Sequence, residues 1–234
     1  MKKLVVILAV VAAVFSFLQA KQGGNYMDLL KNIHWLGHDT FKIKAGGKVI
    51  YIDPFQIRSS EKADLILITH PHHDHFSPED ISQISTPDTL VVSIAGVLKD
   101  MNCLTQEVKA GDKLLAAGFK VEVIPAYNID KKFHPKEAGM VGYILTAGGV
   151  RIYHAGDTDL IPEMKKLKVD VALLPVSGTY VMTSEEAAQA ANLIKPKVAV
   201  PMHYGSIAGS EADAKRFADK LKGKVDVVIM HREK

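Results

Sequence analysis

The sequence predicts an α/β (α+β) protein whose core is two β-sheets with helices on the outside. Short apolar or β-branched runs of strand length recur along the chain from residue 49 onward. Gly46-Gly47 and Gly148-Gly149 are typical of hairpin turns between paired strands. Near the C-terminus, strand-like runs alternate with helical patterns. Hairpins followed by this alternation favour two sheets covered by helices.

The strands and helices can be assigned in chain order. Predicted strands cover residues 49–52, 65–69, 89–94, 120–124, 142–146, 151–153, 171–176, 198–201 and 225–230. Thr183 and Glu186 have the spacing of a capping box, which predicts a helix that runs to about residue 194. Ser210 is expected to cap a second helix to about residue 222, whose apolar positions at three- and four-residue spacing pack one face on a sheet.

Length and composition favour one domain with a sizeable core. The chain has 234 residues, of which 47% are hydrophobic and 24% charged. The net charge is +3, and subtracting the two charges of Lys2 and Lys3 leaves +1 for the remainder. This balance gives no basis for a nucleic-acid partner. The single cysteine, Cys103, has no partner for an internal disulfide.

The N-terminus has the pattern of a secretion signal. Lys2 and Lys3 precede an apolar run over residues 4–18, and the sequence turns polar after Ala20. We expect a signal peptide over 1–20, a linker over 21–32 and a single folded domain over 33–234. The apolar run is short for a membrane span, so no stable span is expected beyond an uncleaved leader. The leader predicts export to the periplasm or the medium, whereas initiation at Met27 would give a cytoplasmic protein.

A compact block of metal-ligand residues follows the apolar run 65–68. His70, His72, Asp74 and His75 place four candidate ligands within six residues. Imidazole and carboxylate groups are ligands of zinc, iron and manganese. The spacing lets His70 and His72 bind one ion while Asp74 and His75 reach a second. A surface histidine cluster is the alternative, and the motifs downstream argue against it.

Two further motifs each follow an apolar run. Asp157 lies in the first, over residues 153–158, and His203 lies in the second, over residues 201–205. Ligands at the ends of successive buried strands converge on one edge of a sheet. Asp157 can bridge two ions with its two oxygens, and His203 can complete the shell of the second ion.

From about Ile33 to its end, the chain resembles the metallo-β-lactamase fold superfamily. Within it, the resemblance is to small metal-dependent hydrolases related to L-ascorbate-6-phosphate lactonase and N-acylphosphatidylethanolamine phospholipase D. Residues 35–41 are similar to their opening W-L-G-H-x-T-F. Asp53 looks like the family's first-motif aspartate, which braces the histidine loop. The resemblance implies a four-layer αβ/βα sandwich with a two-metal site between the sheets.

The expected cofactor is a pair of divalent ions, zinc or alternatively manganese or iron, because histidine and aspartate ligands do not distinguish them. Two such ions can share a hydroxide and stabilise an oxyanion. Asp74 is also the candidate catalytic residue, as a proton shuttle next to the hydroxide. The assigned ligands are His70 and His72 for metal one, Asp74, His75 and His203 for metal two, and Asp157 as the bridge.

The third ligand of metal one is open between two interpretations. The superfamily has a histidine after the strand that ends near Pro125, where this chain has Ala126-Tyr127-Asn128. His134 is the favoured ligand, and Asn128 would then stand behind it or face the substrate. In the alternative, His134 is a solvated loop residue and metal one keeps an open position.

The roles of several other residues are open at this point. His38 either faces the site or is structural, and His154 is expected to orient a ligand. Tyr180 and Tyr204 either contact substrate or pack. Three lysines flank His134 and either meet an anionic group or solubilise the loop: Lys131, Lys132 and Lys136.

The function predicted from these features is hydrolysis of a small, anionic ester, lactone or phosphodiester. The expected partner is therefore a small-molecule substrate. Two alternatives stand beside this prediction: an iron-dependent oxidoreductase of the same fold, and a metal-binding protein without turnover.

Overall fold

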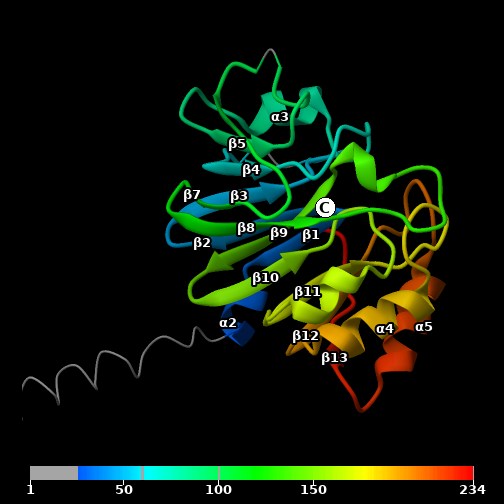
Figure 1. Cartoon of the computed structure of the whole chain (residues 1–234). Helices are drawn as coiled ribbons and strands as arrows, with labels where there is room; N and C mark the ends of the chain where they lie inside the picture. The colour runs from blue at the N-terminus through cyan, green and yellow to red at the C-terminus, as the bar shows by residue number, and fades with distance from the viewer. Residues whose placement is uncertain (1–25, 59–60, 100, 234) are drawn as a thin grey trace, which may run out of the picture.

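The computed structural model describes residues 26–58, 61–99 and 101–233. The expected signal peptide lies outside the described residues. The fold is a mixed α/β sandwich of two sheets, as the sequence predicts (Figure 1). The described chain begins with the short helix α2 (Tyr26–Leu30), inside the stretch expected to be a linker, and Leu29 of this helix is buried.

The two sheets contain all the strands of the described residues. The first has the spatial order β1-β2-β3-β4-β5-β6, and the second the order β13-β12-β11-β10-β9-β8-β7. The strands of the first sheet are β1 (Ile33–Gly37), β2 (Thr40–Ala45), β3 (Lys48–Ile52), β4 (Leu65–Leu67), β5 (Leu90–Ser93) and β6 (Leu104–Glu107). Those of the second are β7 (Lys113–Ala116), β8 (Phe119–Pro125), β9 (Val141–Ala147), β10 (Val150–His154), β11 (Val171–Pro175), β12 (Val198–Met202) and β13 (Asp226–Val227).

The sheets pack face to face, with helices outside. The Tyr143 hydroxyl on β9 donates to the carbonyl of Ile68 beyond β4 at 2.8 Å, and Phe41 of β2 meets the ring of His154 edge-on. Helix α3 lies beside the first sheet, and α4 and α5 cover the second (Figure 1). These helices are α3 (Pro78–Ile84), α4 (Ser184–Ile194) and α5 (Glu211–Leu221), and two 3-10 turns are η1 (Lys136–Ala138) and η2 (Pro162–Lys166).

Both glycine-pair hairpins are confirmed, between β2 and β3 and between β9 and β10. Four strands were not predicted: β1, β2, β6 and β7. The side chains of β1 and β2 are buried on both faces for most of their length, so they lack the alternation that marks a half-buried strand. The predicted strand 225–230 was too long, because only Asp226 and Val227 pair with β12. Helix α3 was also missed, although Ser77 caps it and Pro78 starts it.

Parallel pairing determines where the loops lie. β3 and β4 are parallel in the first sheet, and β10, β11 and β12 are parallel in the second. The carboxyl ends of parallel strands lie at the same edge of a sheet, so the loops that leave them gather there. Every candidate ligand predicted from the sequence lies just beyond such an edge or beyond the neighbouring β8.

The end of the described chain binds the last residues of β1. The Glu233 amide donates to the Trp35 carbonyl at 2.9 Å, and Arg232 Nε donates to the Leu36 carbonyl at 2.7 Å. Lys42 Nζ lies 2.8 Å from the Glu233 carboxylate. These contacts restrain the segment that leads into His38.

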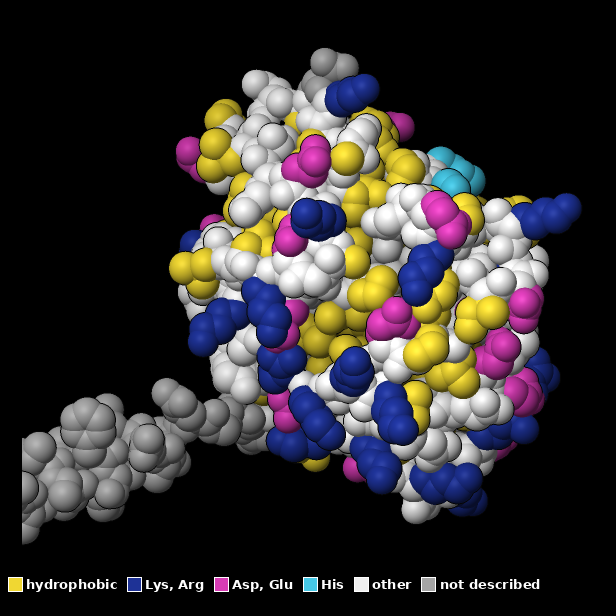
Figure 2. Space-filling model, in the orientation of Figure 1, with side chains coloured by type: hydrophobic (Ala, Val, Ile, Leu, Met, Phe, Trp, Pro, Cys, Tyr) yellow, Lys and Arg dark blue, Asp and Glu magenta, His cyan; other side chains and the backbone are white. Residues whose placement is uncertain are grey.

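Figure 2 shows how charged side chains are distributed on one face of the molecule. Lys and Arg side chains are most crowded at the lower end of that face, and histidine reaches the surface at its upper right edge. Within the described residues, every helix is too short or too polar to cross a membrane.

Replacing Thr183 with alanine should destabilise the fold by about 1 kcal/mol, because it removes the cap of α4. The Thr183 hydroxyl accepts from the Glu186 amide at 3.2 Å, and the Glu186 carboxylate accepts from the Thr183 amide at 2.8 Å. Chemical denaturation of T183A and T183S checks this. The serine variant keeps the oxygen and should remain close to wild type; equal losses in both variants would contradict the capping explanation.

Candidate metal centre

Loops from both sheets bring the predicted ligands together with two further candidate residues, His38 and Asp53. All are buried except His72, which is intermediate in exposure. The residues and the strands they follow are His38 after β1, Asp53 after β3, His70, His72, Asp74 and His75 after β4, His134 after β8, Asp157 after β10 and His203 after β12.

Three imidazoles form a first cluster. His72 Nδ1 lies 3.1 Å from His70 Nε2 and 3.2 Å from His134 Nε2. The structure therefore brings His134 to His70 and His72, although it stands 62 residues from His72 in the sequence. Asn128 Oδ1 lies 3.0 Å from His134 Nδ1, on the far side of the ring from the cluster.

Hydrogen bonds behind this cluster determine where its protons are. The Thr69 hydroxyl donates to Asp53 Oδ2 at 2.6 Å. The hydroxyl oxygen of Thr69 can therefore only accept from His70 Nδ1, which lies 3.0 Å away. His134 Nδ1 faces two acceptors, Asn128 Oδ1 and the Tyr180 carbonyl, and must donate to them. Once Nδ1 carries the proton, the Nε2 atom of each neutral imidazole has a lone pair.

The Nε2 lone pairs of His70 and His134 therefore both face His72 Nδ1. Protons from water or from the protein satisfy such a group of acceptors poorly. Only His72 has a proton to share within the cluster. A cation would satisfy all three nitrogens. A tetrahedral ion with Zn–N bonds of about 2.0–2.1 Å would separate its nitrogen ligands by about 3.4 Å. The distances of 3.1 and 3.2 Å to His72 are close to that value.

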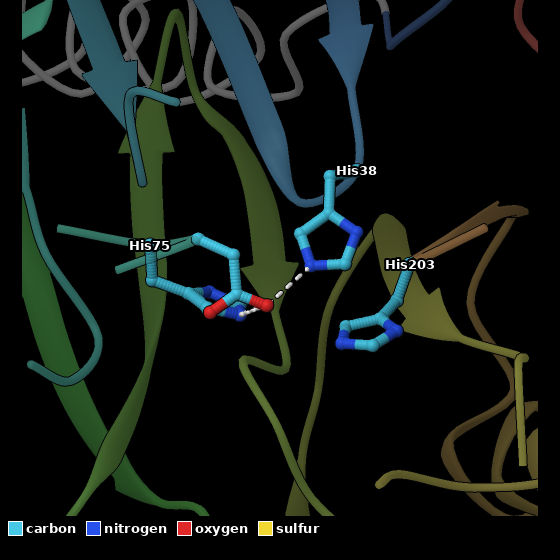
Figure 3. A group of neighbouring side chains, drawn as sticks. His38, His75 and His203 are labelled. Atoms are coloured by element: carbon cyan, nitrogen blue, oxygen red, sulfur yellow. Dashed lines mark hydrogen bonds and ion pairs between the residues drawn. The ribbon is translucent and has the colours of Figure 1, made fainter. Parts of the chain in front are cut away.

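A second cluster lies beside the first. His38, Asp74, His75 and His203 place one ligand atom each within 4.8 Å of one another. His38 Nε2 lies 3.1 Å from Asp74 Oδ2. Figure 3 shows the rings of His38, His75 and His203 approaching one space from three different segments.

Asp157 touches both clusters. Its Oδ2 lies 3.3 Å from His134 Nε2 and 3.2 Å from His203 Nε2, and its Oδ1 lies 3.3 Å from His75 Nε2. Burial opposes a charged carboxylate here. The imidazoles of His203 and His75 outweigh that effect and hold the pKa of Asp157 well below its usual range. One ionised carboxylate thus lies between the two groups of nitrogens.

Several buried polar atoms in the second cluster lack a well-aligned hydrogen-bond partner among the described residues. They are His38 Nδ1, His75 Nε2 and His203 Nε2, together with Asp157 Oδ1 and both oxygens of the adjacent Asp39. Buried polar groups are almost always satisfied, so such a concentration of unsatisfied atoms needs an explanation. A divalent ion fits these donors, because nitrogen and carboxylate oxygen are its usual ligands.

The histidines differ in protonation. Burial lowers the pKa of His70, and it also lowers that of His134 and takes that of His38 to about 4. These rings are therefore neutral, which is the form that binds metal. Burial opposes the charged form of His75 as well. The charge of Asp157 and then the contact with Asp53 outweigh it, and the pKa of His75 is raised well above its usual range.

Asp39 was not predicted as a site residue. Its side chain is fully buried, and it shares a cluster with His75, Asp157 and His203 whose ligand atoms lie within 4.8 Å. Burial raises the pKa of Asp39 well above its usual range. Its position next to His38 in the opening motif was the available signal, but Asp39 lies in the two-residue turn between β1 and β2, where aspartate is common.

Backbone strain accompanies the site. His38, Asp53 and His203 have positive φ angles of 51°, 45° and 59°. Such conformations cost of order 1–3 kcal/mol each and persist where surrounding contacts fix them. The His203 amide donates to the His38 carbonyl at 3.1 Å, and Trp35 Nε1 donates to the same carbonyl at 2.8 Å.

The remaining predicted residues surround the clusters. Asp53 accepts from His75 Nδ1 at 2.8 Å, and His154 Nε2 lies 2.8 Å from the Asp39 carbonyl. Tyr180 lines a cavity with His72 and His134. Tyr204 is buried and stacks on Trp35 at a ring distance of 4.8 Å, outside the walls of that cavity.

Comparison with known proteins gives consistent matches over most of the chain. Residues 32–203 match the family described as Beta-lactamase superfamily domain. The chain is similar to a UPF0173 metal-dependent hydrolase of Archaeoglobus fulgidus, with 34% identity over 220 residues that cover 85% of this chain and 95% of the relative.

Two solved structures share the fold and a substantial part of the sequence. A protein of Parabacteroides distasonis has 36% identity and a TM-score of 0.77, covering 86% of this chain and 93% of its own. Igni18, a novel metallo hydrolase from the hyperthermophilic archaeon Ignicoccus hospitalis, has 28% identity and a TM-score of 0.71, covering 86% of this chain and 95% of its own. The narrower resemblance to L-ascorbate-6-phosphate lactonase and N-acylphosphatidylethanolamine phospholipase D stays a prediction.

Zinc should bind the metal-free protein more tightly as pH rises from 6.5 to about 9. Burial opposes a charged His203, but the Asp157 carboxylate outweighs it and raises the pKa of His203 from 6.5 to about 9. Zinc must displace the proton of His75 as well as this His203 proton, so the apparent affinity should rise by about tenfold to a hundredfold per pH unit over this range. The same proton stabilises the metal-free fold below pH 6.5, and this stability is lost as pH rises through about 9.

Titration calorimetry at several pH values, in buffers of different ionisation enthalpy, reports both the affinity and the protons released. Zinc affinity that stays constant over this range, with no proton release, would contradict the assignment of a protonated His203.

Proposed function

The chain belongs to the beta-lactamase superfamily and is a metal-dependent hydrolase of the metallo-β-lactamase fold, and on that basis we propose that it acts through two divalent ions. The proposed reaction is hydrolysis of a small ester, lactone or phosphodiester, for which the ions, if held by the residues of the two clusters, would supply the hydroxide. One observation carries the proposal: a single ionised carboxylate, Asp157, lies within 3.3 Å of ligand nitrogens from both clusters.

The proposed ligands follow the two clusters. Zinc is proposed for the first position because three neutral imidazoles are a common zinc ligand set, and for the second because it offers imidazole nitrogen and carboxylate oxygen, which also bind zinc. Asp39 and His38 stand next to the second position and are candidates to complete or to brace it. The ligand assignment is His70, His72 and His134 for metal one, Asp74, His75 and His203 for metal two, and Asp157 between them.

The ions, when bound, would supply a hydroxide at neutral pH and positive charge near the scissile bond. The protein's own residues would then position groups and move protons. The side chain of Asp74 is 11% exposed and lines the cavity, so it can exchange a proton with the solvent. His38 Nε2 holds Asp74 Oδ2 at 3.1 Å and orients it. Asp74 is thus the proposed proton shuttle.

An anionic substrate was predicted partly from the lysines that flank His134. Lys131 forms an ion pair with Asp159, and Lys136 lies 3.6 Å from the Glu163 carboxylate. These lysines therefore have acidic partners of their own. Two of the three flanking lysines are thus engaged by acidic groups, so the proposal extends to uncharged esters and lactones.

Asp157→Ala should lose at least one metal ion per chain. Its rate of hydrolysis should fall by on the order of 100-fold or more. Removing this carboxylate leaves His75 and His203 without their shared negative partner. Elemental analysis and turnover of a test lactone on the same preparation measure both effects. Iron in place of zinc would favour the oxidoreductase alternative.

Asp170→Ala is the matched control for Asp157→Ala. Asp170 is a half-buried carboxylate that pairs with Lys197 at 2.9 Å, outside both clusters. It should keep its metal and its activity. Full metal content and full activity in Asp157→Ala would refute the binuclear proposal.

His134→Ala should weaken one ion selectively, because it removes a nitrogen from the first cluster only. Asn128→Ala should lower metal affinity less, by about 10–100-fold, because Asn128 only orients the His134 ring through Nδ1. Competition with a chromophoric chelator resolves the two binding steps. If His134→Ala retained both wild-type affinities, His134 would be only a packing residue in the loop.

A further inference from the structure

The metal clusters open into a cavity of about 220 Å³. Apart from His73, its walls consist of cluster residues and three others: Phe133, Tyr180 and Ile207. We infer that these three side chains form an apolar subsite that selects the aryl or branched-alkyl part of an uncharged substrate. This inference rests on the proposed function, because it places that group next to the reacting bond.

The subsite is assembled from three separate loops. Phe133 lies between β8 and η1, Tyr180 between β11 and α4, and Ile207 between β12 and α5. The rings of Phe133 and Tyr180 meet edge to face at 4.6 Å. This arrangement is favourable for aromatic pairs and holds both rings in place.

Two of the three residues expose apolar surface that a ligand could cover. Phe133 is 52% exposed and Ile207 is 43% exposed. Large side chains of this kind are costly to leave in water, and they gather where a partner or ligand binds. Here they lie in one cavity with His72, His134 and Asp157.

Among the described residues, no lysine or arginine lines the walls. Lys131 is held by Asp159, and Lys136 lies over the Tyr127 ring at 4.5 Å and near Glu163. A carboxylate or phosphate on the distal part of the substrate would therefore lie against apolar rings without a cationic partner. Burying an unpaired charge is costly, so the cavity disfavours such a group.

The volume limits the size of the group. An apolar cavity of about 150 Å³ can hold benzene. The 220 Å³ at this site accommodates one ring with the adjoining carbonyl, but not a long acyl chain. The inferred substrate is a small aryl or branched-alkyl ester or lactone.

Three hydroxamates test this without relying on turnover, because the hydroxamate group chelates the ions whatever is attached to it. Benzohydroxamate carries a ring, acetohydroxamate a methyl group, and the monohydroxamate of succinic acid a carboxylate. Calorimetry on the zinc-loaded protein should show benzohydroxamate binding at least about tenfold more tightly than acetohydroxamate. The succinic compound should bind no more tightly than acetohydroxamate.

Phe133→Ala and Ile207→Ala should each reduce the benzo-to-aceto affinity ratio at least about threefold, and the double variant should bring it close to the ratio of the free chelators in solution. Their acetohydroxamate affinity and zinc content should not change. Ile129→Ala is the matched control: Ile129 is on the same loop as Phe133 and 57% exposed, but outside the cavity walls. Its ratio should equal that of wild type.

The two proposals fail in different ways. If acetohydroxamate does not bind the zinc-loaded protein, the metal-centre proposal is overturned and the subsite with it. If acetohydroxamate binds but the ratio survives in the double variant, or the succinic compound binds most tightly, the metal centre stands and the apolar subsite is refuted.

Discussion

The hydrogen bonds of the Asp53 carboxylate orient the histidines that the first sheet contributes to the metal centre. Asp53 Oδ1 accepts from the Thr69 amide at 2.7 Å, and Oδ2 accepts from the Thr69 hydroxyl and from His75 Nδ1. Through Thr69, the same carboxylate also fixes the proton of His70. One fully buried acid at the end of β3 thereby turns the Nε2 atoms of two histidines, His70 and His75, toward the proposed ion positions.

The Asp157 carboxylate links the two clusters across the two sheets. It approaches along the loop after β10 in the second sheet and meets His75 from the first. Gly156 allows this approach, since its φ is +62° and an added Cβ would lie 2.8 Å from the Val141 carbonyl and 3.2 Å from Thr69. The packing of one sheet on the other therefore fixes the distance between the clusters.

The features that could be predicted from the sequence are those whose signal lies within a short stretch of the chain. The block from His70 to His75 and the two-sheet fold could be predicted, because local spacing and hairpin turns carry them. For His134, the role of third ligand of metal one was only one of two alternatives, because it lies within a loop and does not directly follow a predicted strand. Asp39 was missed because its burial depends on the packing of both sheets. The ion pair between Lys131 and Asp159 joins residues 28 positions apart, which no local pattern reveals.

The close spacing of the ligand block affects how an ion acts on folding. Four of the proposed donors lie within six residues, so the chain retains a partial chelating segment even when it is unfolded. An ion stabilises the native state only by the difference between its affinities for the folded and the unfolded chain. Zinc should therefore raise the melting temperature by less than its native-state affinity alone implies. An excess of zinc during synthesis can occupy this segment before Asp157 and His203, which are contributed much later in the chain, are in place.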